Sequence, residues 1–277
     1  MGPTGSQTET KEYILGTDAQ ELERLRFQHQ VWVKEAYALF ERAGLRAGHH
    51  VLDIGCGPGF VTLELAHVVG PHGRIVASDQ SARFLDVLRR ECARLGRMQV
   101  QPCLGPVEEL DLAPRSLDAA YARWLFCWLA DPSPVLERVA RALKPGGALL
   151  LQEYLDWGAM SLIPASAAFA RVVEACLASW KAGGATIDFT RRVPELAAAH
   201  GFTVEHFAPR ARLGMVGSLE WRWIDQFLRE YLPKVETRGL LRADEREAWQ
   251  REWEQRTAEG ASWVTTPTVA DVILRKR

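Results

Sequence analysis

The sequence has few of the features that mark secreted, metal-binding or membrane-spanning proteins. Its five cysteines are widely spaced and form no CxxC pair, so neither a disulfide framework nor a zinc ribbon is expected. The seven histidines form no HxxxH or HExxH pattern, and we predict no metal site. No uncharged apolar run approaches the roughly 18 residues that a membrane helix needs, and the first residues show no basic or apolar leader. We therefore expect a cytoplasmic protein with no membrane partner.

Neither sign of charge is in excess. Lys and Arg total 34 against 35 Asp and Glu, a net charge of −1, which argues against a protein whose main partner is nucleic acid. Hydrophobic residues make up 47% and charged residues 25% of the chain, and 277 residues suffice for one large α/β domain. We expect a small-molecule substrate, no nucleic-acid partner, and either a monomer or a homodimer.

From residue 51 the chain alternates between short apolar strands and helices. The pattern predicts strands at 51–54, 74–78, 98–104, 117–121 and 148–152, and helices at 60–69, 81–95 and 135–143. Such alternation is typical of a doubly wound α/β fold with a parallel sheet covered by helices on both faces. Two later segments, 202–207 and 269–274, are predicted as further strands.

The flanking segments are predicted to be helical. Residues 18–42 form an amphipathic pattern that Asp18 can cap, with Glu21 three residues later. The later helices are expected at 159–182, 193–199, 218–232 and 243–258. Seven of the ten tryptophans follow residue 150. Because apolar and aromatic side chains line most small-molecule pockets, a flat or greasy substrate is favoured over a charged one.

A glycine-rich turn follows the first predicted strand, with the sequence Asp53-Ile54-Gly55-Cys56-Gly57-Pro58-Gly59. Glycines allow a sharp turn at a strand end and a close approach of the backbone to a ligand near a helix N-terminus. Phe60 stands where a dinucleotide fingerprint would require glycine. Asp79 ends the second strand, where a carboxylate can accept both hydroxyls of a ribose.

This stretch resembles motif I of the class I S-adenosylmethionine-dependent methyltransferases, and the turn at 144–147 is similarly typical of them. The resemblance covers residues 45–153 and looks closest to the small-molecule branch that includes ubiquinone and menaquinone biosynthesis. The segments 13–16 and 152–154 also look like that branch. It implies a seven-stranded Rossmann-like sheet in the order 3-2-1-4-5-7-6, with the last strand antiparallel.

The same resemblance implies a domain organisation with a helical lid. Residues 1–45 would form an N-terminal lid segment, and residues 46–277 the cofactor-binding methyltransferase domain. Lid insertions are expected at about 154–200 and 208–264.

The resemblance also implies that S-adenosylmethionine is the cofactor and S-adenosylhomocysteine the product. One position departs from the family pattern, because Pro106 stands where an Asp usually takes the adenine amino group, and proline has no side-chain acceptor. Arg123 is expected to contact the cofactor through its backbone. The full set of predicted cofactor-binding residues is Tyr13, Gln28, Asp53, Gly55, Cys56, Gly57, Gly59, Asp79, Gln80, Pro106, Val107, Glu108, Arg123 and Trp124.

The implied reaction is methyl transfer to O, N or C of an apolar or aromatic metabolite. Such a displacement mainly needs the reactants held in line and water excluded, and some acceptors also need a base. The candidate catalytic residues are His29, Glu153 and Tyr154, with Asp156 also near the site. Glu153 could equally be a structural carboxylate that caps the following helix. The alternatives are a non-canonical use of the cofactor by an isomerase-like or cyclase-like enzyme, and a catalytically silent cofactor-binding protein.

Overall fold

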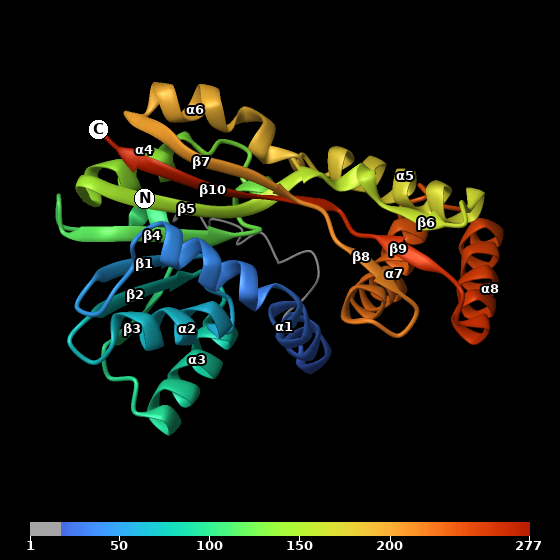
Figure 1. The fold of residues 1–277 in the computed structure, drawn as a ribbon, viewed down its shortest axis with the longest axis horizontal. Helices are drawn as coiled ribbons and strands as arrows, with labels where there is room; N and C mark the ends of the chain where they lie inside the picture. The colour runs from blue at the N-terminus through green and yellow to red at the C-terminus, as the bar shows by residue number, and fades with distance from the viewer. Residues whose placement is uncertain (1–17) are drawn as a thin grey trace, which may run out of the picture.

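A seven-stranded sheet forms the centre of the computed structural model, which describes residues 18–277 (Figure 1). The strand order is β3-β2-β1-β4-β5-β10-β7. Their bounds are His50–Ile54 for β1, Arg74–Asp79 for β2, Val100–Leu104 for β3, Leu117–Arg123 for β4, Leu143–Asp156 for β5, Phe202–Arg210 for β7 and Thr268–Lys276 for β10. With β7 and β10 as the sixth and seventh strands of the family pattern, this is the predicted order, which is thereby confirmed.

The register places the ends of the parallel strands at one edge. Leu52 of β1 pairs with Val76 of β2 and with Ala120 of β4, all in parallel. β10 runs antiparallel to both β5 and β7, as predicted for the last strand. Because parallel strands present their carboxyl ends together, the glycine turn after β1 and the residues that end β2 and β4 meet at this edge.

Helices cover both faces of the sheet. One apolar cluster joins α1 (Ala19–Arg42), α2 (Phe60–Val69) and α3 (Ala82–Leu95) to one face. A second cluster joins α4 (Ser133–Ala142), α6 (Val193–Ala199) and the 3₁₀ segments η1 (Val107–Glu109), η2 (Phe126–Trp128) and η4 (Phe189–Arg192) to the other. The predicted cap of the first helix is confirmed, since the Asp18 side chain accepts from the Glu21 amide at 2.9 Å.

A second unit, which we call the cap, lies to the right of the sheet in Figure 1. It consists of α5 (Ala167–Ala182), α7 (Leu219–Thr237) and α8 (Ala243–Glu259) with a three-stranded antiparallel sheet of β6 (Ser161–Ile163), β9 (Trp263–Thr265) and β8 (Leu213–Met215). The 3₁₀ segment η3 (Trp157–Ala159) leads into it. Six of the seven late tryptophans are buried in or beside this unit, and Trp263 is 40% exposed.

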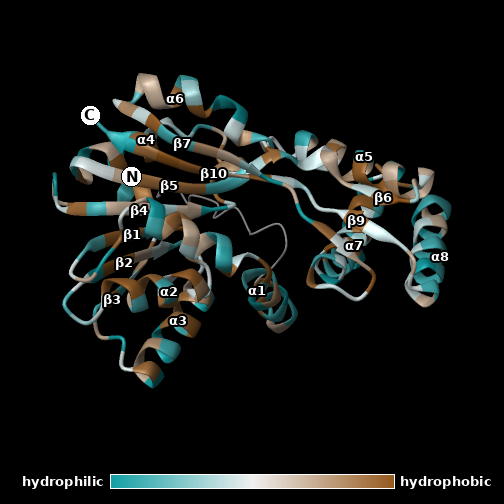
Figure 2. Cartoon of the chain, viewed as in Figure 1, coloured by the Kyte–Doolittle hydropathy of each residue, from teal (hydrophilic) through white to brown (hydrophobic). Residues whose placement is uncertain are grey.

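Two expectations for the cap differ from the structure. The helix predicted from residue 159 begins only at Ala167, because β6 and Pro164 precede it and Ser166 caps its N-terminus. The segment 208–264 contains β8 and β9 besides its two helices. α8 is mostly hydrophilic (Figure 2) yet buries Trp249 and Trp253. None of the helices within residues 18–277 is long and apolar enough to cross a membrane.

Candidate active site

The glycine turn after β1 leaves room for a ligand at one of its three glycines. Gly55, Gly57 and Gly59 all have positive φ, at +64°, +55° and +85°. A Cβ at Gly59 would lie 2.3 Å from Cδ1 of Leu88, so helix packing requires glycine there. A Cβ at Gly57 would meet no heavy atom within 4 Å. The turn therefore presents an open backbone surface at Gly57, where a ligand can approach closely.

Asp79 lies directly beside this turn. Its Oδ2 accepts from the Gly57 amide at 2.8 Å, and its Oδ1 accepts from the Ser81 amide at 2.8 Å. Burial raises the pKa of Asp79, and the amide donors partly offset that rise. Each carboxylate oxygen has a further lone pair, so the group can accept hydroxyl donors as well.

Asp53 and Cys56 are less accessible than expected for ligand-binding groups. Asp53 is 2% exposed and accepts from Oγ1 of Thr62 at 2.6 Å. Burial raises the pKa of Asp53 to about 6, against the opposing charge of Arg123. The Cys56 thiol is half-buried, and burial raises its pKa well above the ordinary value. Asp53 therefore supports the turn by holding α2 through Thr62, and a direct contact with the cofactor stays a prediction.

The segment after β3 is anchored mainly through its backbone. Gly105 has a φ of +125°, and its amide donates to the carbonyl of Asp79 at 3.0 Å. Pro106 precedes η1, Val107 is 4% exposed, and Arg138 donates to the Glu108 carbonyl at 2.6 and 3.0 Å. The substitution of Pro106 thus leaves an ordered turn next to Asp79. The adenine-binding role of this turn remains a prediction.

His29 is held between a cation and a carboxylate. Nη2 of Arg123 lies 3.2 Å from Nδ1 of His29, and Oε1 of Glu64 lies 3.3 Å from its Nε2. Because arginine can only donate, Nδ1 is the acceptor and the proton sits on Nε2, facing Glu64. Burial lowers the pKa of His29, so the ring is neutral near pH 7. The Tyr37 hydroxyl donates to the other oxygen of Glu64 and completes the chain of contacts.

Arg123 retains one unsatisfied group at the end of β4. Its Nη1 is buried and has no hydrogen-bond partner among residues 18–277. The guanidinium carbon lies 5.0 Å from the ring centroid of Trp124. A buried guanidinium nitrogen without a partner is costly, and it is suited to a carboxylate that arrives with a ligand.

Trp124 adopts a rare conformation and connects the sheet to the cap. Its φ is +52°, which is strained for a side chain of this size. Its ring stacks on Tyr154 at 5.8 Å and on Trp223 at 6.1 Å, and Trp32 meets it edge-on at 5.9 Å. The four rings form an apolar wall between the carboxyl edge of the sheet and the cap.

The remaining predicted residues fall into three groups. Gln28 is 9% exposed, and its Oε1 accepts from Arg24 at 3.0 Å and from Nε1 of Trp223 at 3.1 Å. Asp156 forms an exposed ion pair with Arg191, and Gln80 is exposed. Tyr13 lies outside the described residues.

Several contacting residues carry no recognisable signal in the sequence. Glu64, Tyr37, Leu125 and Trp223 lie on helices or turns whose pattern predicts only a buried or solvated face. Their partners are distant in sequence, as with Tyr37 and Glu64, so only the fold brings them together.

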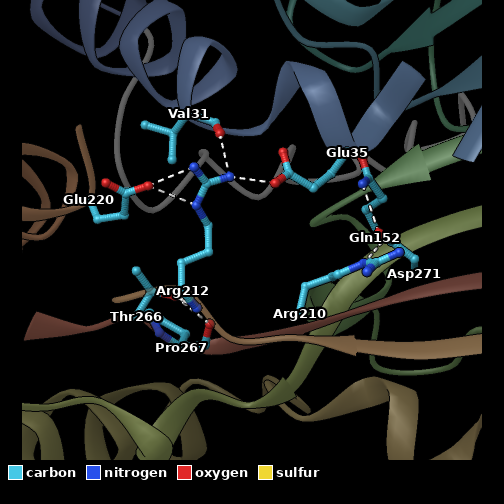
Figure 3. Close-up of polar contacts among 9 residues, drawn as sticks. All are labelled: Val31, Glu35, Gln152, Arg210, Arg212, Glu220, Thr266, Pro267 and Asp271. Atoms are coloured by element: carbon cyan, nitrogen blue, oxygen red, sulfur yellow. Dashed lines mark hydrogen bonds and ion pairs between the residues drawn. The ribbon is translucent and has the colours of Figure 1, made fainter. Parts of the chain in front are cut away.

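Arg212 ties the cap to α1 next to the site. Figure 3 shows its guanidinium between Glu35 and Glu220, with the Val31 carbonyl also in reach. Its Nη1 contacts Glu35 at 2.5 Å, and its Nη2 contacts Glu220 at 2.6 Å. The same view shows Asp271 of β10 joining Gln152 and Arg210. α1 thus contacts the sheet and the cap through both apolar and ionic groups.

We expect Arg212→Ala to lower the free energy of unfolding by about 2 kcal/mol, because two partly buried carboxylates and one carbonyl lose their donor. Urea unfolding measures the change. Arg229→Ala is the matched control, since Arg229 forms exposed pairs with Asp225 and Glu254 and should cost less than about 1 kcal/mol. Equal losses in the two variants would contradict the structural role of Arg212.

Comparisons with known proteins locate a family domain over the same edge of the sheet. A family model described as a methyltransferase domain matches residues 52–151. The ubiquinone/menaquinone biosynthesis C-methyltransferase UbiE of Pseudoalteromonas translucida is 30% identical over 127 residues, which cover 46% of this chain and 49% of that protein. The chain spans about a third to a half of the length of the curated relatives that it matches.

Solved structures share the fold over a longer stretch. Geranyl diphosphate C-methyltransferase from Streptomyces coelicolor A3(2) gives a TM-score of 0.57 at 12% identity, covering 90% of this chain and 77% of that one. The [4+2]-cyclase SpnF gives a TM-score of 0.57 at 20% identity, covering 88% and 80%. At these identities the likeness shows the fold alone. Together with the family match, it confirms the predicted resemblance: residues 52–151 are a methyltransferase domain of the class I S-adenosylmethionine-dependent type.

Proposed function

We propose that this protein transfers a methyl group from S-adenosylmethionine to O, N or C of an apolar or aromatic small molecule. The observation that carries the proposal is the open backbone at Gly57 directly beside the Asp79 carboxylate. An open glycine turn and a carboxylate at neighbouring strand ends suit a nucleoside, whose ribose donates two hydroxyls. The match of residues 52–151 to a methyltransferase domain supports the same reading.

The residues at this edge fit the parts of the cofactor. Asp79 would accept from the ribose hydroxyls, and the Gly57 backbone would lie along the chain that joins ribose to sulfur. The buried Nη1 of Arg123, which has no partner in the described part of the chain, would hold the carboxylate of the methionine part. When bound, the cofactor supplies a methyl group on a positively charged sulfur. Arg123 would then bind through its side chain rather than through the backbone contact expected from the sequence.

The chain's own groups would orient the acceptor and exclude water. The Trp124 and Tyr154 rings offer an apolar, stacked wall at the strand ends. Where the acceptor must lose a proton, we propose His29 as the base, because its Nδ1 lone pair points to the β4 end. Glu64, bonded to Nε2, would stabilise the imidazolium that forms. Arg123 occupies that lone pair in this structure and would have to turn to the cofactor carboxylate to release it.

Titration of the purified chain with S-adenosylmethionine and S-adenosylhomocysteine tests the proposal. Binding stabilises the folded state by mass action, so saturating ligand should raise the unfolding midpoint by several degrees, and calorimetry should give a single site. A rise with both ligands would justify a screen of aromatic and apolar metabolites, read as the gain of one methyl group. No response to either ligand would contradict the cofactor assignment.

A second function keeps the cofactor site but changes the reaction. The likeness to the [4+2]-cyclase SpnF shows that this fold is shared by an enzyme named for ring formation. Product mass separates the two functions, because a cyclase or isomerase returns a product of unchanged mass. Methyl transfer remains the better supported reading, since the matched family model is a methyltransferase domain.

Replacing Asp79 with alanine should weaken binding of S-adenosylmethionine by about 1.5–3 kcal/mol, the range for hydrogen bonds to a charged group. Calorimetric dissociation constants measure the loss. Asp86→Ala is the control, because Asp86 is an exposed carboxylate on α3 that pairs only with Arg89 among the described residues. A defect confined to kcat, with the dissociation constant intact, would contradict the ribose-binding role.

A further inference from the structure

The Glu153 carboxyl is buried and bound to backbone amides rather than open to a ligand. Glu153 is 0% exposed at a point near the end of β5. Its Oε1 accepts from the Leu125 amide at 2.7 Å and from the Phe126 amide at 2.9 Å. Its Oε2 is also buried and has no partner in the structure as described. Both amides belong to the turn that joins β4 to η2, so one carboxylate oxygen holds that turn closed.

The turn that Glu153 holds carries two side chains with separate tasks. Trp124, directly before it, has the strained φ of +52°, and its own amide donates to the Gln152 carbonyl at 3.1 Å. Leu125 packs against the glycine turn, since a Cβ added to Gly55 would lie 3.0 Å from its Cδ1. A single buried carboxyl thus lies behind both the aromatic wall and the glycine turn.

We propose that Glu153 is a positioning residue, whose carboxyl fixes the β4–η2 turn so that the Trp124 ring faces the cap and Leu125 supports the cofactor turn. This proposal rests on the proposed function for the meaning of the two surfaces. The strain at Trp124 needs surrounding contacts to maintain it. Two hydrogen bonds from consecutive amides to one charged acceptor supply such a constraint.

A role for Glu153 as the base that accepts a proton from the substrate fits the geometry less well. A general base must come within about 3 Å of the proton that it removes. The Glu153 side chain is fully enclosed, and two amides occupy Oε1. Cys127, the nearest neighbour of its carboxyl after those amides, is also fully buried. The carboxyl therefore acts on the site through the backbone that it holds.

Two variants separate the acceptor from the charge and the volume. Glu153→Gln keeps an oxygen that can accept from both amides, whereas Glu153→Met keeps the length but has no such acceptor. We expect Met to raise the dissociation constant for S-adenosylhomocysteine about tenfold and Gln to change it by less than about threefold. Met should also remove the near-UV circular dichroism of the Trp124 stack, as defined by the Trp124→Leu difference spectrum, while Gln retains it. Asp271→Asn is the control for a buried carboxylate away from this turn.

Several results would overturn the proposal. A folded Met variant with wild-type affinity and a wild-type near-UV spectrum would do so, as would a Gln variant that loses the stack as completely as Met. If the Met variant does not fold, amide exchange decides: Leu125 and Phe126 should exchange slowly in the wild type and in Gln, and fast exchange in the wild type would contradict the clamp. The spectra and the exchange rates need no ligand, so they still test Glu153 if the wild type binds no S-adenosylhomocysteine and the proposed function fails.

Discussion

Replacing Gly57 with valine should abolish measurable binding of S-adenosylmethionine and S-adenosylhomocysteine while the chain still folds. The space around a Cβ at this position is free of protein atoms within 4 Å, so a side chain there meets no described neighbour. That same space is where we place the cofactor, and a branched side chain would fill it. We expect a loss of more than about 3 kcal/mol, beyond about 150-fold in the dissociation constant. Isothermal calorimetry with the product, which is chemically stable, measures it.

The backbone conformation of Gly57 requires a matched control. Its φ of +55° penalises any side chain, so valine also costs some stability. Gly96 at the end of α3 has a φ of +64° and the same absence of neighbours around a Cβ, and it lies outside the proposed site. Gly96→Val should therefore lower the unfolding midpoint similarly and leave binding unchanged. Tight binding by Gly57→Val would remove the glycine turn from the cofactor site, whereas weak binding by both variants would assign the loss to strain.

The central sheet could be predicted because its signals are local. Each strand from β1 to β5 is a short apolar run next to a glycine, proline or charged boundary, and each helix between them has its own period. The family resemblance then supplied the strand order and the antiparallel β10, both of which the structure confirms. The turn at 144–147 persists as an interruption within β5, where Leu117 pairs with Leu143 but Ala119 pairs with Ala148.

The small sheet of the cap could not be predicted, because its strands are three residues long and pair across the chain. Ser161 pairs with Thr265, and Leu213 pairs with the same residue from the other side. Three residues are too few to show alternation, so the sequence around them was interpreted as helix or connection. The burial that stabilises this sheet comes from α5 and α7, which the local pattern of the strands does not reveal.

The site was predicted in position but not in its internal contacts. The glycine turn and Asp79 were found from the strand ends, and the structure brings them into direct contact. The role of Glu153 depends on two amides that lie 27 and 28 residues earlier in the chain. Similarly, the tautomer of His29 is set by Arg123, 94 residues away. Such long-range pairs arise from the fold, so a list of candidate bases from the sequence could not rank them.

The Glu153 carboxyl should also give the wild type a pH dependence of stability that Glu153→Gln lacks. Burial raises the pKa of Glu153 to about 7 from the value of 4.5 that applies to an exposed glutamate. The folded chain therefore keeps this proton at pH values where the unfolded chain has released it. The resulting stabilisation is complete below about pH 4.5 and is lost as the pH rises to about 7. We expect a loss of about 3 kcal/mol across this window.

Urea unfolding of the wild type and Glu153→Gln at several pH values between 4.5 and 8 measures this effect. Asp53, whose pKa burial raises to about 6, changes stability in the same direction, but it is present in both chains and cancels in their difference. The wild type should therefore lose stability relative to Gln as the pH rises, with most of the change between pH 5 and 7. A difference that stays constant would mean that the two amide donors keep the carboxyl ionised throughout. The clamp would then act as a charged acceptor at every pH, and a base at this position would have no proton to exchange near neutrality.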